Sequence, residues 1–298
     1  MHIGIVFNPG SGVRAARGAL GEVTSAIASH NHTLEVFDRA VQPDFERVIS
    51  AHAHEFDRVV VIGGDGTLNG VVNGVMASEH PEIPVAFVPT GRGKDTARSL
   101  RSWKPQQLTG GAFEAAAPIA TDLIRVELAS AKRRYCMNVA NIGLAAHAAV
   151  LANGLPRWLG TGSYIGGAVR AIVPPRAFTL EVAIDGEDIS DDNALLLSVC
   201  NGRSFGGGVY IAPEADTRDG LFDIVIAHNA NLGDLALQLP KLKSGTPFEH
   251  DALKRLRGCD IIVRAVASPW YDIDGEQLAS QPVRFTVMPG ALNWIGPA

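Results

Sequence analysis

The sequence predicts two domains: an amino-terminal α/β domain built on a parallel sheet, and a carboxy-terminal domain that is mostly an antiparallel β-sandwich. At 298 residues the chain exceeds the roughly 100 to 200 residues of a typical single domain. Its first third alternates short apolar runs with helix-like stretches, whereas after about Ile124 strand-like runs follow one another with shorter connections. With 46% apolar and 19% charged residues, the composition is that of a globular chain.

Residues 1–123 form the predicted α/β domain. Its strand-like segments are Ile3–Phe7, Thr33–Phe37, Arg58–Ile62 and Val85–Val88, and its helix-like segments are Arg14–Ser29, Phe45–Ala53 and Leu68–Ala77. Strands that alternate with helices pair in parallel, and ligands bind at the carboxyl ends of such strands. We therefore expect the loops Asn8–Gly12, Gly63–Thr67 and Pro89–Asp95, which follow three of the strands, to meet at one edge of the sheet.

Residues 124–287 form the predicted β-rich domain, which we expect to bind the substrate. Its strand-like segments are Leu123–Leu128, Tyr135–Ala140, Thr179–Ile184, Ala194–Cys200, Leu221–Ile226, Cys259–Ala265 and Val283–Val287. Two further segments, Leu151–Val173 and Leu232–Lys243, have the pattern of helical or irregular insertions. The tail, about residues 288–298, is free to pack back on the α/β domain.

Composition excludes several classes of function. A net charge of -5 argues against broad electrostatic binding to nucleic acid, which requires a basic surface. Cys136, Cys200 and Cys259 are widely separated and odd in number, which indicates a reducing compartment. No secretory signal or run of about 18 apolar residues is present. We expect a cytoplasmic protein without a transmembrane segment, whose membrane contact is peripheral, at the inner face.

A glycine-rich loop, Gly63-Gly64-Asp65-Gly66-Thr67, follows a predicted strand and precedes a predicted helix. Glycine lets the backbone approach a phosphate closely, and amide groups at a helix start can donate to the anion. A carboxylate at Asp65 beside phosphate implies a cation such as Mg²⁺. The alternative is a tight strand-to-helix turn in which Asp65 caps the helix.

The loop matches neither the P-loop pattern nor the dinucleotide pattern. It resembles the signature shared by diacylglycerol kinases, sphingosine and ceramide kinases, bacterial lipid kinases and, more distantly, NAD kinases. Further similar blocks are Asn8–Gly12, Asn201–Gly208, Ala212–Ala215, Asp219–Leu221 and Asp274–Glu276. Their order covers nearly the whole chain, which is identified as a member of the diacylglycerol kinase catalytic-domain family, with an NAD-kinase-like first domain.

The resemblance implies an ATP-dependent lipid kinase in which ATP lies between the domains and its γ-phosphate passes to a hydroxyl of a diacylglycerol-like or sphingoid lipid. The implied nucleotide-binding residues are Asn8, Pro9, Ser11, Gly12, Gly63, Gly64, Gly66, Thr67, Gly91 and Arg92. Asp65 would organise catalytic Mg²⁺, and Glu276 would accept the hydroxyl proton with Asp274 nearby. The alternative for Asp274-Gly275-Glu276 is an ordinary hairpin turn.

The resemblance also implies a structural Mg²⁺ in the second domain. The matching positions are Asp216, Asp219 and Leu221, and oxygen ligands of this kind suit a hard cation. The alternative is a surface turn that precedes the strand Leu221–Ile226.

The third loop departs from the family pattern Pro-x-Gly-Thr-x-Asn-Asp. This chain has Arg92 and Lys94 where that pattern has a threonine and an asparagine. Both cations could pair with phosphate oxygens. Alternatively, the long side chains fill the nucleotide site, or Lys94 pairs with Asp65 or Asp95 and removes the acid from its metal.

Lipid access requires an apolar opening, for which Leu155–Tyr164, with Arg157 and Trp158, is one candidate. The alternative is that Trp158 packs on the domain core. Two rival functions remain: a kinase for a soluble substrate, like NAD kinases, and a non-catalytic nucleotide- or lipid-binding protein. The expected partner is a lipid at the membrane surface, and a homodimer remains open.

Overall fold

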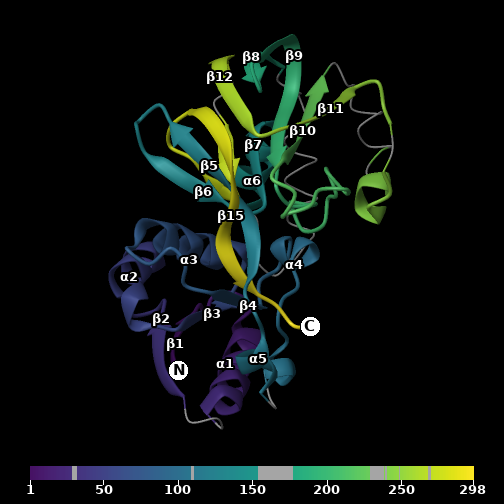
Figure 1. Cartoon of the computed structure of the whole chain (residues 1–298). Helices are drawn as coiled ribbons and strands as arrows, with labels where there is room; N and C mark the ends of the chain where they lie inside the picture. The colour runs from purple at the N-terminus through teal and green to yellow at the C-terminus, as the bar shows by residue number, and fades with distance from the viewer. Residues whose placement is uncertain are drawn as a thin grey trace. The chain divides into compact units, whose positions relative to one another are not determined.

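The computed structural model (Figure 1) describes residues 1–28, 32–108, 111–153, 177–228, 238, 240–247, 249–267 and 270–298. The chain forms two compact units. Unit 1 contains Met1–Asp122 together with Pro289–Ala298, and unit 2 contains Leu123–Met288. The predicted segment Leu155–Tyr164 and most of the two predicted insertions lie outside the described residues. Across the described ranges, no helix is long and apolar enough to cross a membrane.

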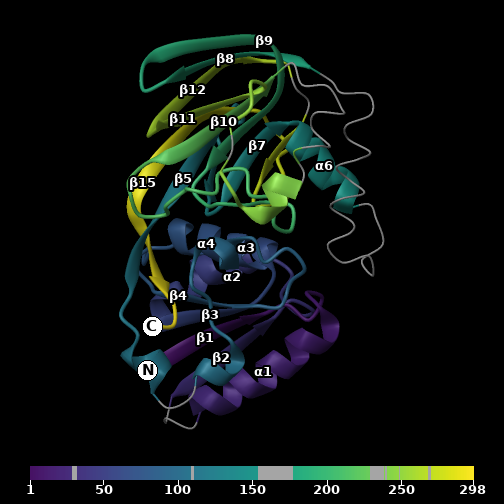
Figure 2. The same cartoon turned by 90° about the vertical axis from the view of Figure 1, so that its right-hand side faces the viewer.

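Unit 1 is built on a parallel sheet whose strand order is β2-β1-β3-β4. Its strands are β1 (His2–Phe7), β2 (Thr33–Asp38), β3 (Arg58–Gly63) and β4 (Val85–Pro89). Its helices are α1 (Val13–Ala28), α2 (Phe45–His52), α3 (Asp65–Ala77), α4 (Thr96–Ser99) and α5 (Ala112–Ala115), with short 3₁₀ helices η1 (Ala53–Glu55) and η2 (Pro105–Leu108). Figure 2 shows α1 on one side of these strands and α2 and α3 on the other.

The inner strands of unit 1, β1, β3 and β4, are mostly apolar on both faces, and helices lie on both sides of the sheet. On one face, Ile5, Val60 and Ala86 pack against Val23 and Ile27 of α1 in a single buried cluster. Parallel sheets with two covered faces have such continuous apolar runs rather than alternating ones. Along these three strands, polar groups are therefore concentrated in the loops that follow the strand ends.

Unit 2 is a mostly antiparallel β structure. Its strands are β6 (Arg133–Cys136), β7 (Val139–Gly143), β8 (Phe178–Ile184), β9 (Glu187–Cys200), β10 (Phe222–His228), β11 (Leu253–Gly258), β12 (Asp260–Val266), β13 (Tyr271–Ile273) and β14 (Glu276–Gln277), with one helix, α6 (Leu144–Asn153). The long β9 pairs with β8 through its first half and with β7 and β10 through its second. A large apolar core fills one face of β7, β9 and β13, and a smaller apolar cluster that includes Ala145 of α6 lies on the other.

Two strands carry the chain from one unit to the other: β5 (Ile119–Leu128) and β15 (Pro282–Ile295). In unit 2, β15 pairs antiparallel with β12. In unit 1, its last residues pair parallel with β4, Trp294 opposite Val85 and Ile295 opposite Ala86. The indole of Trp294 donates to the carbonyl oxygen of Arg101 at 2.8 Å, and that of Trp103 to Ile295 at 2.9 Å.

One predicted strand is divided in the structure. The segment Tyr135–Ala140 is not continuous but breaks into β6 and β7 at Met137 and Asn138. The amide groups of these two residues donate to the carboxylate of Asp274 instead of to a neighbouring strand. A side chain distant in sequence thus replaces the strand partner, which the local pattern could not indicate.

Candidate functional site

Three loops meet at the carboxyl ends of β1, β3 and β4. The Asn8 side chain, after β1, donates to the Thr67 hydroxyl at 2.7 Å, and the Ser11 and Thr90 hydroxyls are 2.9 Å apart. The Gly63 carbonyl oxygen accepts from the backbone amide of Thr90 at 2.7 Å. These contacts join the three loops that the sequence predicts to meet, and they line the edge of the sheet with hydroxyl and amide groups.

Close approach of backbones explains two of the glycines. A Cβ on Gly91 would lie 2.6 Å from the Cα of Gly64, and one on Gly12 would lie 2.5 Å from the carbonyl oxygen of Thr90. Both distances are far below van der Waals contact, so these positions exclude any side chain. Gly12 also has φ of +75°, a conformation that glycine adopts without steric cost.

Gly66 is different, because a Cβ there would meet nothing within 4 Å. Gly66 lies in the first turn of α3, where no side chain caps the helix start at Gly64. Uncapped amide groups at a helix N-terminus, together with the helix dipole, favour an anion. Packing within the protein does not explain Gly66, whereas close approach of a ligand would.

Asp65 connects the second loop to the third. Its Oδ1 accepts from the backbone amide of Thr96 at 3.0 Å, and its Oδ2 accepts from that of Asp95 at 3.4 Å. The carboxylate therefore holds the start of α4 as well as occupying the first position of α3. Each oxygen retains a further lone pair, so the group can still bind a cation.

Arg92 and Lys94 lie in the third loop, beside Asp65. Asp95 pairs with Arg98 at 3.1 Å, and among the described residues no ion pair joins Lys94 to Asp65 or Asp95. The expected alternative in which Lys94 neutralises these acids is therefore not the arrangement found. Lys94 is exposed and has φ of 55°, a left-handed conformation that is unfavourable for lysine.

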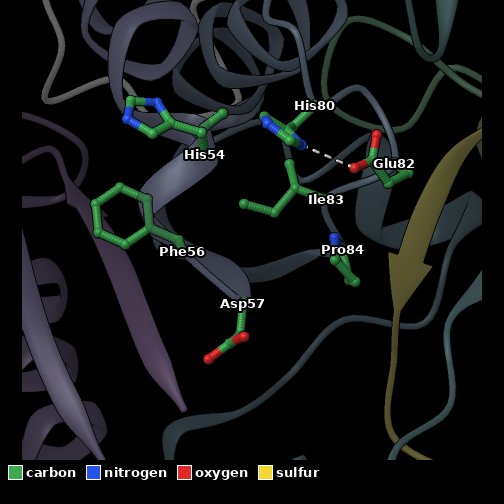
Figure 3. Close-up of a pocket in the computed structure, with 8 residues that line it drawn as sticks. His54, Phe56, Asp57, His80, Glu82, Ile83 and Pro84 are labelled. Atoms are coloured by element: carbon green, nitrogen blue, oxygen red, sulfur yellow. Dashed lines mark hydrogen bonds and ion pairs between the residues drawn. The ribbon is translucent and has the colours of Figure 1, made fainter.

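A pocket of about 170 Å³ lies at the opposite ends of the same strands (Figure 3). It is lined by residues that precede β3 and β4, including His54, Asp57, His80 and Glu82. His80 Nδ1 lies 3.0 Å from Glu82 Oε1, and Asp57 accepts from the backbone amide of His2 at 2.7 Å. Because the residues that line it precede the strands whereas the three loops follow them, the pocket is not part of the site at the three loops.

In unit 2, Asp274-Gly275-Glu276 forms a hairpin turn between β13 and β14. Ile273 pairs with Glu276 across the hairpin, and Asp274 and Gly275 have φ of 49° and 83°. Two consecutive left-handed residues define a tight turn of the type that Asp-Gly favours. The hairpin expected as the alternative for this motif is thus present, and it fixes the position of the two carboxylates.

The Asp274 carboxylate is held by the backbone between β6 and β7. It accepts from the amide groups of Met137 at 2.8 Å, Asn138 at 2.9 Å and Val139 at 3.0 Å. The Cys136 thiol also donates to it at 3.3 Å, and burial raises the pKa of that thiol well above its usual range. Asp274 therefore anchors the turn.

Glu276, in contrast, presents its carboxylate to solvent. The side chain is 52% exposed and pairs with Arg134 at 3.1 Å. Arg134 is itself only 16% exposed, so it orients the carboxylate from the protein side. Of the two acids in the motif, Glu276 is the more exposed.

Family comparisons decide what kind of protein carries these features. The model described as "Diacylglycerol kinase catalytic domain" matches residues 2–130. The model described as "YegS C-terminal NAD kinase beta sandwich-like domain" matches residues 138–296, which is more than half of the chain. The chain belongs to the diacylglycerol kinase family. The sequence-based predictions of family and fold class are therefore confirmed, and the family is one of phosphotransferases with an alcohol group as acceptor.

The similarity to other members of the family covers nearly the whole chain. It is 25% identical to "Putative lipid kinase SAB0675c" of Staphylococcus aureus strain bovine RF122 / ET3-1 over 297 residues, which cover 97% of this chain and 95% of the relative. A similar structure, "Crystal structure of a putative diacylglycerol kinase from Bacillus anthracis str. Sterne", has a TM-score of 0.79 at 20% identity. That match covers 99% of this chain and 96% of the other, and shows a shared fold.

The residues predicted to bind a structural Mg²⁺ lie in one turn, and each of the two carboxylates has an arginine as its neighbour. Asp219 accepts from the Leu221 amide at 3.0 Å and pairs with Arg257, and Asp216 lies 3.8 Å from Arg218. In the described part of the chain, no cluster of three or more His, Cys, Asp or Glu side chains could hold a metal ion. A site made of two carboxylates and a backbone carbonyl oxygen is not of that kind, so the structural Mg²⁺ at Asp216, Asp219 and Leu221 stays a prediction. Arg257 would have to release Asp219 for the ion to bind.

Asp272 is a residue of this kinase family member that the sequence did not single out. It precedes the Asp274–Glu276 turn by two residues and is only 3% exposed. Burial raises the pKa of its carboxyl to about 7, a hydrogen bond from Asn141 opposes that shift, and the charge of Asp274 adds to it. The available signal was an acid inside the alternating Tyr271-Asp272-Ile273 strand, where an apolar or neutral side chain is expected.

Proposed function

We propose that the protein is an ATP-dependent lipid kinase, which transfers the γ-phosphate of ATP to a hydroxyl of a diacylglycerol-like or sphingoid lipid. The observation that carries the proposal is the meeting of three polar loops at the carboxyl ends of β1, β3 and β4, in a chain of the diacylglycerol kinase family. The names of the staphylococcal relatives support a lipid acceptor.

The three loops supply the proposed nucleotide contacts. These are Asn8, Pro9, Ser11, Gly12, Gly63, Gly64, Gly66, Thr67, Gly91 and Arg92. The uncapped start of α3 offers amide groups to the phosphates, and Arg92 and Lys94 add positive charge in the adjacent loop. Phosphoryl transfer depends mainly on alignment and charge neutralisation, both of which such a site provides.

Asp65 is the proposed acid for a catalytic Mg²⁺. Mg²⁺ typically binds through one or two carboxylates together with substrate phosphates and water, and a bound ion neutralises the charge on the phosphates. Asp65 fits such a site because each of its oxygens accepts one backbone amide and keeps a free lone pair. The amides that it accepts from Asp95 and Thr96 fix its direction.

Glu276 is the proposed general base. Its carboxylate takes the proton of the lipid hydroxyl, the oxygen bonds to the γ-phosphorus, and the bond from that phosphorus to the bridging oxygen of ADP breaks. Arg134 holds the carboxylate, and Asp274 holds the turn on which it stands. We propose that the lipid is met at a membrane surface, by a cytoplasmic protein peripheral to the inner face.

Transfer from labelled ATP tests the proposal. The purified chain is mixed with vesicles that contain diacylglycerol or sphingosine, and separately with NAD as a soluble acceptor. We expect the wild-type protein to transfer label to a lipid. Glu276→Gln should lower kcat by roughly 10²- to 10⁴-fold, which is the usual effect of removing a general base. Asp65→Asn should lose Mg²⁺-dependent transfer.

Glu181→Gln, at an exposed position of β8, is the matched control and should behave as the wild type. Transfer of label to NAD alone would show that the acceptor is a soluble molecule and not a lipid. ATP binding without transfer to any acceptor would indicate a non-catalytic binding protein and not a kinase. Unchanged transfer by Glu276→Gln would remove Glu276 as the base.

A further inference from the structure

A buried polar rung crosses three neighbouring strands of unit 2. Asp272 of β13 stands directly opposite Asn141 of β7, which stands directly opposite Ser198 of β9. Their exposed fractions are 3%, 3% and 0%. Buried polar side chains are costly unless hydrogen bonds satisfy them, so three in one rung require an explanation.

Hydrogen bonds connect the rung from end to end. The Ser198 hydroxyl donates to the Asn141 Oδ1 at 2.6 Å, and the Asn141 side chain is hydrogen-bonded to the Asp272 carboxyl. Asp272 Oδ2 then accepts from the backbone amide of Gly275 at 3.0 Å. The chain of hydrogen bonds therefore ends on the central residue of the Asp274-Gly275-Glu276 turn.

Apolar side chains flank the rung on its own face of the sheet. Residues 139, 141 and 143 of β7 and residues 196, 198 and 200 of β9 share that face, on which Val139, Leu196 and Cys200 belong to an apolar cluster. The rung is thus a polar row in apolar surroundings. Such a row defines strand register, because a shift by one residue would bury its polar groups without partners.

We propose that Asp272 is a positioning residue, which from this rung holds the Asp274-Gly275-Glu276 turn and thereby the base Glu276. The proposal rests on the kinase function proposed above. Asp274 fixes the turn from the side of Met137 and Asn138, whereas Asp272 fixes it through Gly275. These two sets of hydrogen bonds together fix the orientation of the turn and thereby the direction of the Glu276 side chain.

The neutral form of Asp272 is the one that suits the rung. Its Oδ1 is buried without a hydrogen-bond partner in the described part of the chain, and an ionised oxygen in that position is strongly disfavoured. Burial accordingly raises the pKa of this carboxyl to about 7. Above that pH a second negative charge forms beside Asp274, which should displace the turn.

Among the described residues, several titratable groups lie near Asp272 or on the elements beside it, and Glu276 of β14 is one of them. Asp274 lies in the turn, Cys136 lies at the end of β6, and His147 of α6 stacks on Trp270 with ring centroids 4.3 Å apart. Cys136 and Asp274 are bonded to each other. His147 is therefore the group that must be distinguished from Asp272 near neutral pH.

The pH profile of kcat for the full-length enzyme tests the proposal. We expect the wild type to lose activity as pH rises through about 7. Asp272→Asn, which has the shape of the neutral acid, should retain activity and lose this alkaline limb. Asp272→Ala should lower kcat at least tenfold across the profile and leave KM for ATP within about twofold, because the proposed ATP contacts are in unit 1. His147→Gln should keep the limb.

Amide hydrogen exchange keeps the test independent of activity. The Gly275 amide should be protected in the wild type and in Asp272→Asn, and should exchange at least tenfold faster in Asp272→Ala. A protein that transfers no phosphate but shows this pattern would refute the proposed function and retain the positioning role. Unchanged Gly275 exchange in Asp272→Ala, or loss of the alkaline limb in His147→Gln rather than Asp272→Asn, would overturn the inference.

Discussion

At the scale of single residues, Lys94 combines a left-handed backbone with a long charged side chain. The related pattern has asparagine at this position, and asparagine tolerates positive φ better than other non-glycine residues. With φ of 55°, Lys94 is thus strained in a loop of the proposed nucleotide site. Strain of this kind persists where it serves a function.

We predict that Lys94→Asn stabilises the protein by about 1 kcal/mol, because it relieves this strain. Denaturant unfolding measures the gain, and Lys104→Asn, at an exposed position, should give none. If the ammonium group contacts phosphate, the same variant binds ATP more weakly. A variant with neither greater stability nor weaker ATP binding would show that Lys94 has no such role.

Individual residues differ in how far the sequence could assign them. The three-loop motifs locate Asn8, Asp65 and Thr67 because their order along the chain is itself informative. The sequence could not indicate that Asp274 binds the amides of Met137 and Asn138, since that contact joins segments 136 or more residues apart. Asp272 was missed for the same reason: its importance comes from Asn141 and Ser198, on two other strands.

At the scale of elements, α3 carries two glycines that packing does not require. A Cβ on Gly66 would meet nothing within 4 Å, and one on Gly70 would lie 3.9 Å from the Phe45 Cβ, an ordinary contact. Glycine within a helix costs roughly 0.5 to 1 kcal/mol relative to alanine. Alanine substitutions at the two positions can therefore distinguish an effect on helix stability from an effect on ligand binding.

We predict that Gly66→Ala and Gly70→Ala both fold with unchanged or greater stability, whereas only Gly66→Ala weakens ATP binding, by at least about tenfold or 1.4 kcal/mol. The added methyl group would stand where the phosphates approach the start of α3. Thermal unfolding and calorimetric titration with ATP measure the two effects. Equal ATP affinity in the two variants would place the phosphates elsewhere.

Periodicity located the elements of unit 1 well because each is a separate apolar run covered by helices. In unit 2 the sequence underestimated β9, whose first half, Glu187–Asn193, is polar and mostly exposed yet pairs with β8. It missed β11, whose segment Leu253–Gly258 carries three cations. These strands form through main-chain hydrogen bonds, which the hydrophobic pattern of a sequence does not reveal.

At the scale of the whole molecule, one strand contributes to the cores of both units. Phe285 of β15 is buried in the large core of unit 2, and Trp294 of the same strand is buried in unit 1, 6.4 Å from the Phe87 ring. Substitution at either end of β15 should therefore affect a different unit.

We predict that Trp294→Ala costs about 3 to 5 kcal/mol in unit 1, and that Phe285→Ala costs a similar amount in unit 2. Hydrogen exchange followed by mass spectrometry should show lost protection in β3 and β4 for the first variant, and in β8 and β12 for the second. Loss of protection in both units for both variants would instead indicate a single cooperative fold.

Pairing of Trp294 and Ile295 with β4 also bears on how the protein is synthesised. A growing chain emerges from the ribosome with its amino-terminal residues first, so β1 to β4 are exposed long before their last partner exists. Until Trp294 and Ile295 have been synthesised, the edge of β4 lacks this neighbour, and the indole of Trp103 lacks its acceptor, the Ile295 carbonyl oxygen. Unit 1 therefore cannot be completed until unit 2 has been synthesised, and a chain released at Met288 would lack the residues of the proposed ATP-binding unit that follow it.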